Sequence, residues 1–166
     1  MTAVLSEPGQ SVAARRGIPA KVMLARLRDE VASLVASVAV GRPRPRTRRP
    51  VEPVGVDVAR EIRFLKHVAA GLATSPGEEL PFEHAGAGSV LRARDLRWGR
   101  ERLYKLMPGP LDRLDAGQVR IDSAPGRALL NREAGEIVTL RDAGTEKRLL
   151  ITLMTTLPQR LGMRPG

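Results

Sequence analysis

IDSAPGRALLNREAGEIVTL, residues 121–140, predicts a short helix and a strand joined by a turn. Asp122 and Ser123 are residue types that cap helix N-termini. Pro125 suits the first helical turn, where its missing N–H costs nothing. An apolar Ala-Leu-Leu run follows and supplies a buried side for the helix. The residues of 135–140, GEIVTL, then read as a turn glycine that leads into a strand.

Five strands are predicted around this helix, at residues 89–96, 100–107, 119–122, 136–141 and 147–155. Apolar and charged residues alternate in the first two, as they do in half-buried strands. Arg97-Trp98-Gly99 can turn between these two strands to form a hairpin. The strands and the short helix together predict a small antiparallel β domain with one short helix.

Two apolar stripes at helical spacing predict two helices upstream of the β domain. The first stripe consists of Leu24, Leu27, Val31, Leu34 and Val38, and the second of Val58, Ile62, Leu65, Ala69 and Leu72. Stripes this narrow favour an antiparallel hairpin, a coiled coil in which the helices pack on each other. The alternative is that both helices cover a globular core. In either case the fold class is α+β.

Residues 41–55, GRPRPRTRRPVEPVG, separate the two stripes and are too rich in proline to be helical. Five arginines stand against one glutamate in this segment: Arg42, Arg44, Arg46, Arg48 and Arg49 against Glu52. We expect an extended, strongly positive tip of the hairpin. A solvated charged loop without any binding role explains the same composition.

The composition restricts the partner and the compartment. The 166 residues carry a net charge of +10 at pH 7, which favours an acidic partner such as nucleic acid, an acidic protein surface or anionic lipid. The absence of cysteine excludes disulfides and thiolate metal sites and suits a reducing compartment. No apolar run approaches the ~20 residues of a membrane-spanning helix, and the N-terminus lacks a secretory pattern. We therefore expect a cytoplasmic protein without membrane contact.

The central run resembles a known family. Asp122-Ser123-Ala124-Pro125-Gly126-Arg127-Ala128-Leu129-Leu130, followed by Gly135-Glu136-Ile137-Val138, is similar to the C-terminal domain of the bacterial GreA/GreB transcript cleavage factors. In that family a strand leads into D/N-S-P-x-(G/A)-R-A-L-L and then into a G-D/E-x-V-x-V strand. Here Ala124 stands at the family's proline position, and the proline comes one place later. The resemblance covers about residues 86–155 and implies an FKBP-like fold, preceded by a helical hairpin.

The resemblance also implies a partner and a docking surface. In the family, this loop and helix start meet a coiled coil of the largest subunit of RNA polymerase, at the rim of the secondary channel. The corresponding residues here are Asp122, Ser123, Pro125 and Arg127. Helix capping is by itself a sufficient role for Ser123. We therefore expect a transcription regulator that binds RNA polymerase.

Transcript cleavage is not expected. In the resembling family, the hairpin tip carries a pair of acidic residues that help to hold a catalytic Mg²⁺, an ion that prefers oxygen ligands. The tip here is cationic, Glu52 is its only acid, and Asp57 is better explained as a helix cap. Neither His67 nor His84 has a second ligand type at metal-site spacing. No metal, cofactor or enzymatic activity is predicted.

Two other functions are compatible with the same residues. One is a protein similar to the regulator of nucleoside diphosphate kinase, which keeps the C-terminal domain on a shortened hairpin without the acidic tip. The other is a basic DNA- or RNA-binding protein that contacts phosphates without reading sequence. The predicted organisation has five parts: a mobile N-terminal segment (1–18), a helical hairpin (19–73) that includes the Arg/Pro-rich tip (41–55), a linker (74–88), the C-terminal domain (89–157) and a tail (158–166).

Overall fold

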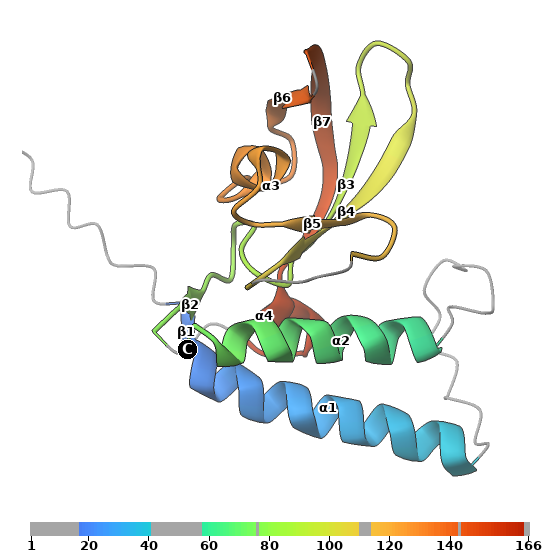
Figure 1. Ribbon diagram of the computed structural model, residues 1–166, viewed down its shortest axis with the longest axis vertical. Helices are drawn as coiled ribbons and strands as arrows, with labels where there is room; N and C mark the ends of the chain where they lie inside the picture. Colours follow the sequence, from blue (N-terminus) through green and yellow to red (C-terminus); the bar gives the residue numbers. More distant parts are fainter. Residues whose placement is uncertain (1–16, 41–57, 76, 110–113, 143, 165–166) are drawn as a thin grey trace, which may run out of the picture.

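The computed structural model describes residues 17–40, 58–75, 77–109, 114–142 and 144–164, and it places two long helices beside a five-stranded sheet (Figure 1). The helices are α1 (Ala20–Val40) and α2 (Val58–Ala73), and the sheet contains β3 (Val90–Asp95), β4 (Glu101–Met107), β5 (Gln118–Arg120), β6 (Ile137–Asp142) and β7 (Thr145–Thr155). Shorter elements are β1 (Ile18–Pro19), β2 (Glu79–Leu80), α3 (Ala124–Leu129) and α4 (Leu157–Arg160). Residues 1–16 of the segment expected to be mobile, and the whole basic tip, lie outside the described residues.

The five strands appear where the sequence predicts them, but the sheet is mixed rather than antiparallel. Its order is β5-β4-β3-β7-β6, and β5 runs parallel to β4. The reason is that residues 108–117, which separate these two strands, are too many for a tight hairpin, and β5 begins beside the last residues of β4. There the Lys105 N–H donates to the Gly117 carbonyl, 2.8 Å away, and Gln118 starts β5 opposite Lys105. A tight hairpin would have forced the antiparallel arrangement.

Three short elements were not predicted. β1 and β2 form an antiparallel pair of their own, in which Ile18 lies opposite Leu80. α4 follows β7 directly and is held by a capping box between Thr156 and Gln159. The buried Thr156 hydroxyl also donates to the Phe82 carbonyl at 3.1 Å, which ties α4 to the segment after β2. Two-residue strands and a one-turn helix are too short for a periodic pattern to reveal.

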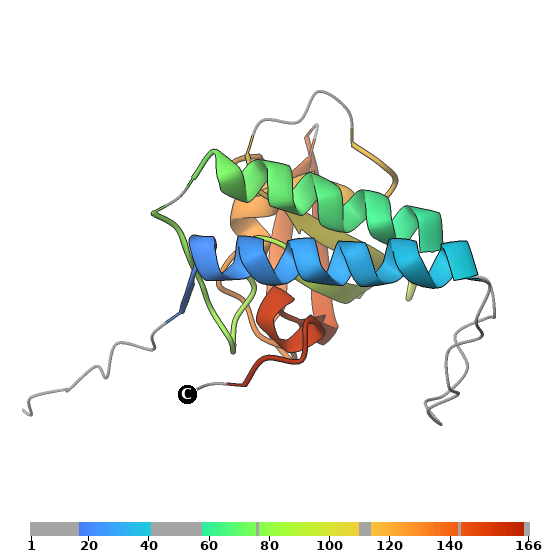
Figure 2. The same cartoon turned by 90° about the horizontal axis from the view of Figure 1, so that it is seen from below.

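α1 and α2 pack against each other and also against the C-terminal part of the chain. One cluster of buried side chains, which we call the basal core, draws on both helices, on β2, on the end of β4 and on α4. Its fully buried members include Met23, Leu27, Phe64, Met107 and Leu157. Figure 2 shows both helices lying across the base of the sheet with α4 next to them. The described parts of the helices therefore cover a globular core.

This packing changes which helix residues are buried. In α1 the predicted stripe is correct for Leu27 and Leu34, but it is wrong for Val38, which is 58% exposed. In α2 it is correct for Leu65 and Leu72, while Val58 is exposed. Phe64 and Val68, outside the predicted stripe, are fully buried. The buried face of α2 is wider than a coiled-coil stripe because it meets α1 on one side and the sheet and α4 on the other.

The residues for which the sequence predicts a linker also contribute to cores. Leu80 and Ala87 belong to the basal core. Ala85 belongs to a second cluster, which lies between α3 and the sheet and includes Leu91, Leu129 and Ile151. The segment between α2 and β3 therefore contacts both clusters.

Candidate functional site

The turn between β5 and α3 carries the residues that the sequence singles out, and it presents Asp122 to solvent. Arg120, the last residue of β5, donates two hydrogen bonds to the Asp122 carboxylate, from Nε to Oδ1 at 2.9 Å and from Nη2 to Oδ2 at 2.5 Å. Despite this pairing, the Asp122 side chain is 55% exposed. The hydrogen bond from Arg120 holds the pKa of the Asp122 carboxyl below its usual value, and the Arg127 charge acts in the same direction. The result is an exposed carboxylate in a fixed orientation, whose charged form is favoured by Arg120.

Ser123 is the N-cap of α3. Its Oγ accepts from the Gly126 N–H at 3.2 Å and donates to the Arg120 carbonyl at 2.6 Å. Its backbone is extended, with φ −76° and ψ 162°, as an N-cap requires. The predicted capping role of Ser123 is thus confirmed, and Pro125 lies in the first turn of α3.

Gly126 allows α3 to sit directly on the end of β5. A Cβ atom at this position would lie 1.9 Å from the Arg120 carbonyl oxygen, which is far inside any permitted contact. The same carbonyl accepts from both the N–H and the hydroxyl of Ser123. Arg120 therefore holds the turn by its main chain while its side chain holds Asp122.

The structure brings Asp122, Ser123, Pro125 and Arg127 together within one turn and helix start. Asp122 and Arg127 are exposed, and Ser123 and Pro125 are half-buried. Arg120 was not among the predicted site residues, although an arginine two residues before an aspartate at a strand end places both on one face. The five arginines expected at the tip, Arg42, Arg44, Arg46, Arg48 and Arg49, lie outside the described residues.

Metal-binding geometry is not found in the described ranges. No group of three or more His, Cys, Asp or Glu residues within them is arranged to hold a metal ion. The His84 Nδ1 lies 3.8 Å from the Glu133 Oε1, and the His67 Nδ1 is buried without a hydrogen-bond partner. Of the helices that the structure describes, none combines the length and apolar character needed to cross a bilayer.

Comparison with known proteins gives solved structures only. GreA factor homolog 1 of Thermus thermophilus aligns with a TM-score of 0.39 at 17% identity, over 81% of this chain and 91% of that one. Gfh1 of Thermus aquaticus aligns at 0.40 and 18%, over 85% and 99%. The prokaryotic transcription elongation factor GreA/GreB from Nitrosomonas europaea aligns at 0.40 and 17%, over 84% and 98%. No protein-family model and no curated protein matches the chain. At these values the likeness does not establish that the chain belongs to a family.

Proposed function

We propose that this protein is a Gre-like transcription regulator that binds bacterial RNA polymerase at the rim of the secondary channel. The observation that supports this most is the Asp122 carboxylate, which is exposed and charged and is oriented by Arg120. It lies within the run of residues that resembles the docking loop of GreA/GreB factors. An exposed acid held by two hydrogen bonds is pre-organised to meet a cationic partner surface, because little side-chain entropy is lost on binding.

The four residues of this surface have different roles in the proposal. Asp122 and Arg127 are exposed and offer opposite charges to the polymerase coiled coil. Ser123 and Pro125 act mainly through the shape of the helix start, since one caps α3 and the other lies in its first turn. The contact is therefore electrostatic and depends on a rigid turn.

We further propose that the protein acts by binding and does not cleave transcripts. A second catalytic Mg²⁺ needs carboxylate ligands at the hairpin tip. Segment 41–55 offers five arginines and one glutamate, a composition that repels a divalent cation. A cationic tip in the channel would instead compete with active cleavage factors.

A capture experiment tests the docking surface. Immobilised protein is incubated with bacterial RNA polymerase at low and at moderate salt, and Asp122→Ala is compared with Asp29→Ala, which removes an exposed aspartate of α1. We expect capture by the wild-type chain at both salt concentrations, loss of capture with Asp122→Ala, and no change with Asp29→Ala. If capture is unchanged by Asp122→Ala and is lost at moderate salt, the result would instead favour a basic protein that binds nucleic acid through phosphate contacts.

A second assay addresses cleavage. A stalled transcription complex is incubated with the protein and Mg²⁺, and the RNA is resolved by length. We expect no shortened transcripts with this protein alone. When an active cleavage factor is also present, we expect this protein to reduce the cleavage by that factor. Robust cleavage by this chain alone would contradict the inference from the cationic tip.

A further inference from the structure

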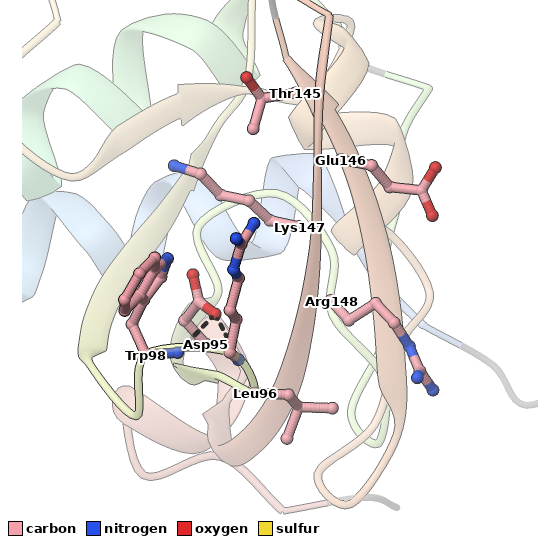
Figure 3. A pocket seen from close by; sticks show the side chains of 8 residues that line it. Asp95, Leu96, Trp98, Thr145, Glu146, Lys147 and Arg148 are labelled. Atoms are coloured by element: carbon pink, nitrogen blue, oxygen red, sulfur yellow. Dashed lines mark hydrogen bonds between the residues drawn. The ribbon is translucent and has the colours of Figure 1, made fainter.

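Two adjoining hollows open where the β3–β4 turn faces the start of β7, and Figure 3 shows the side chains that line the larger one. The larger measures about 370 Å³ and is lined by Asp95, Leu96, Arg97, Trp98, Thr145, Glu146, Lys147 and Arg148. The smaller measures about 210 Å³ and adds Arg100, Arg102 and Tyr104 to the shared Asp95, Trp98 and Lys147. We call the two together the turn pocket. It lies at the opposite end of β4 from the Asp122 turn, because Arg120 is paired with Met107.

The turn holds Trp98 in an exposed position. Asp95 Oδ1 accepts from the backbone N–H groups of Arg97 at 2.8 Å and of Trp98 at 3.3 Å, and the Asp95 carbonyl accepts from the Gly99 N–H at 2.8 Å. Gly99 closes the turn with φ +68°, a conformation that favours glycine. Trp98 is 68% exposed although it is the only tryptophan of the sequence. A large aromatic side chain that is held in place and left uncovered suggests a binding role.

Cations line the same two hollows as this ring. The Arg97 guanidinium carbon lies 5.0 Å from the centre of the Trp98 ring, and Figure 3 shows Lys147 on the same side of β7 as Trp98. Arg100 and Arg102 line the smaller hollow. Within the described part of the chain none of these four cations forms an ion pair.

The acids of the turn pocket are already engaged. Asp95 accepts the turn N–H groups. Glu146 points away from Trp98 in Figure 3 and pairs with Arg141 at 3.6 Å. With one acid, Asp95, against Arg97, Arg100, Arg102 and Lys147, the side of the pocket that holds Trp98 carries a positive net charge and an aromatic platform.

We propose that the turn pocket binds single-stranded nucleic acid. A base stacks on Trp98, and the adjoining phosphates contact the cations of the pocket. Exposed aromatic rings among basic side chains bind single strands without sequence preference, because every base has a π face. An acidic peptide would use the cations but would gain little from the ring. This binding does not depend on polymerase binding.

The sole tryptophan makes a direct test possible. Oligothymidylate and oligouridylate are titrated into the full chain, and the fluorescence of Trp98 is followed, with polyglutamate as the acidic control. We expect saturable quenching by both oligonucleotides and none by polyglutamate. Absence of quenching by the oligonucleotides would overturn the proposal. Equal quenching by polyglutamate would also overturn it and would identify an acidic protein segment as the ligand.

Variants separate the pocket from the arginine-rich segment 41–55. Binding of a labelled oligonucleotide is measured by fluorescence anisotropy. All variants are made in a background chain in which the five tip arginines are replaced by glutamine. Trp98→Ala is expected to weaken binding about tenfold, or ~1.4 kcal/mol, as for the loss of one stacked base. Trp98→Phe should retain most of the affinity, and Arg28→Ala, an exposed cation of α1, should retain all of it. Unchanged binding by Trp98→Ala would refute the stacking.

Lys147→Ala tests the phosphate contact. Removal of one phosphate contact should lower the slope of log affinity against log salt by about 0.7 for a single strand. An unchanged slope would exclude Lys147 from phosphate binding and would contradict the proposed position of the strand.

Discussion

Gly71 of α2 lies against the main chain of Pro108, so closely that a Cβ atom at residue 71 would stand 2.1 Å from the Pro108 carbonyl oxygen. This contact joins α2 to the end of β4. Gly109, which follows Pro108, makes the reciprocal contact, since a Cβ atom at residue 109 would lie 2.9 Å from the Gly71 Cα. Helix and sheet meet here backbone to backbone, at a distance that only glycine permits.

Gly71→Ala is therefore expected to destabilise the protein, although alanine is the better helix former. The added methyl group must push α2 away from Pro108, and overpacking of this kind costs about 1–3 kcal/mol. Urea denaturation followed by circular dichroism measures the change. Gly77→Ala is the matched control, because its Cβ would meet nothing within 4 Å. Equal stability of the Gly71→Ala and wild-type chains would show that α2 is not held against Pro108.

Leu27 and Val38 give a second contrast, within α1. Leu27 is fully buried in the basal core, whereas Val38 is 58% exposed although it lies on the same predicted stripe. Leu27→Ala should lower the free energy of unfolding by about 2–5 kcal/mol, and Val38→Ala should change it by less than about 0.5 kcal/mol. The same denaturation curves report both. A large loss in Val38→Ala would indicate that the coiled-coil stripe continues to the end of α1.

Ser123 allows capping to be separated from docking. Ser123→Ala should destabilise the protein by about 1 kcal/mol, because the Gly126 N–H loses its acceptor. Ser123→Asp, which keeps an acceptor at the cap, should restore most of this stability. Polymerase capture by folded Ser123→Ala should remain close to that of the wild type. If capture is lost while the protein stays folded, the hydroxyl itself contacts the polymerase.

The Asp122 carboxyl should titrate below the usual range of aspartate. Its pKa is lowered in the folded state, so its contribution to stability is present above the pKa of the unfolded chain and is lost as the pH falls through the folded-state pKa. NMR of the carboxyl carbon follows the titration. Arg120→Gln should raise the pKa toward its ordinary value, and Arg94→Gln, whose partner is Glu101, should leave it unchanged. An Asp122 pKa that is insensitive to Arg120→Gln would mean that the two side chains are not paired in solution.

Local signals in the sequence were sufficient for much of the β domain. Ser123 as a cap and the strand positions follow from short-range chemistry, and the structure confirms them. The direction of β5 does not follow from such signals, because it depends on where a long connection brings the chain back. The burial of Phe64 was missed for a related reason. Its contacts, which include the cations of Lys105 and Arg160 over its ring, come from residues distant in sequence.

The candidate site divides in the same way. The residues of the Asp122 turn are contiguous, so a motif can identify them. Trp98, Arg102 and Lys147 are brought together only by strand pairing, and neither their spacing nor their types indicate a pocket. From the sequence, Trp98 was therefore predicted only as part of a turn, without a binding role.

The basal core has a consequence for dissection of the protein. Met107 and Leu157 are shielded from water by side chains of α1 and α2. A truncated chain that starts after α2 would expose these apolar groups and would be prone to aggregate. The two helices thus complete the apolar core beneath the part of the chain that carries both proposed binding surfaces.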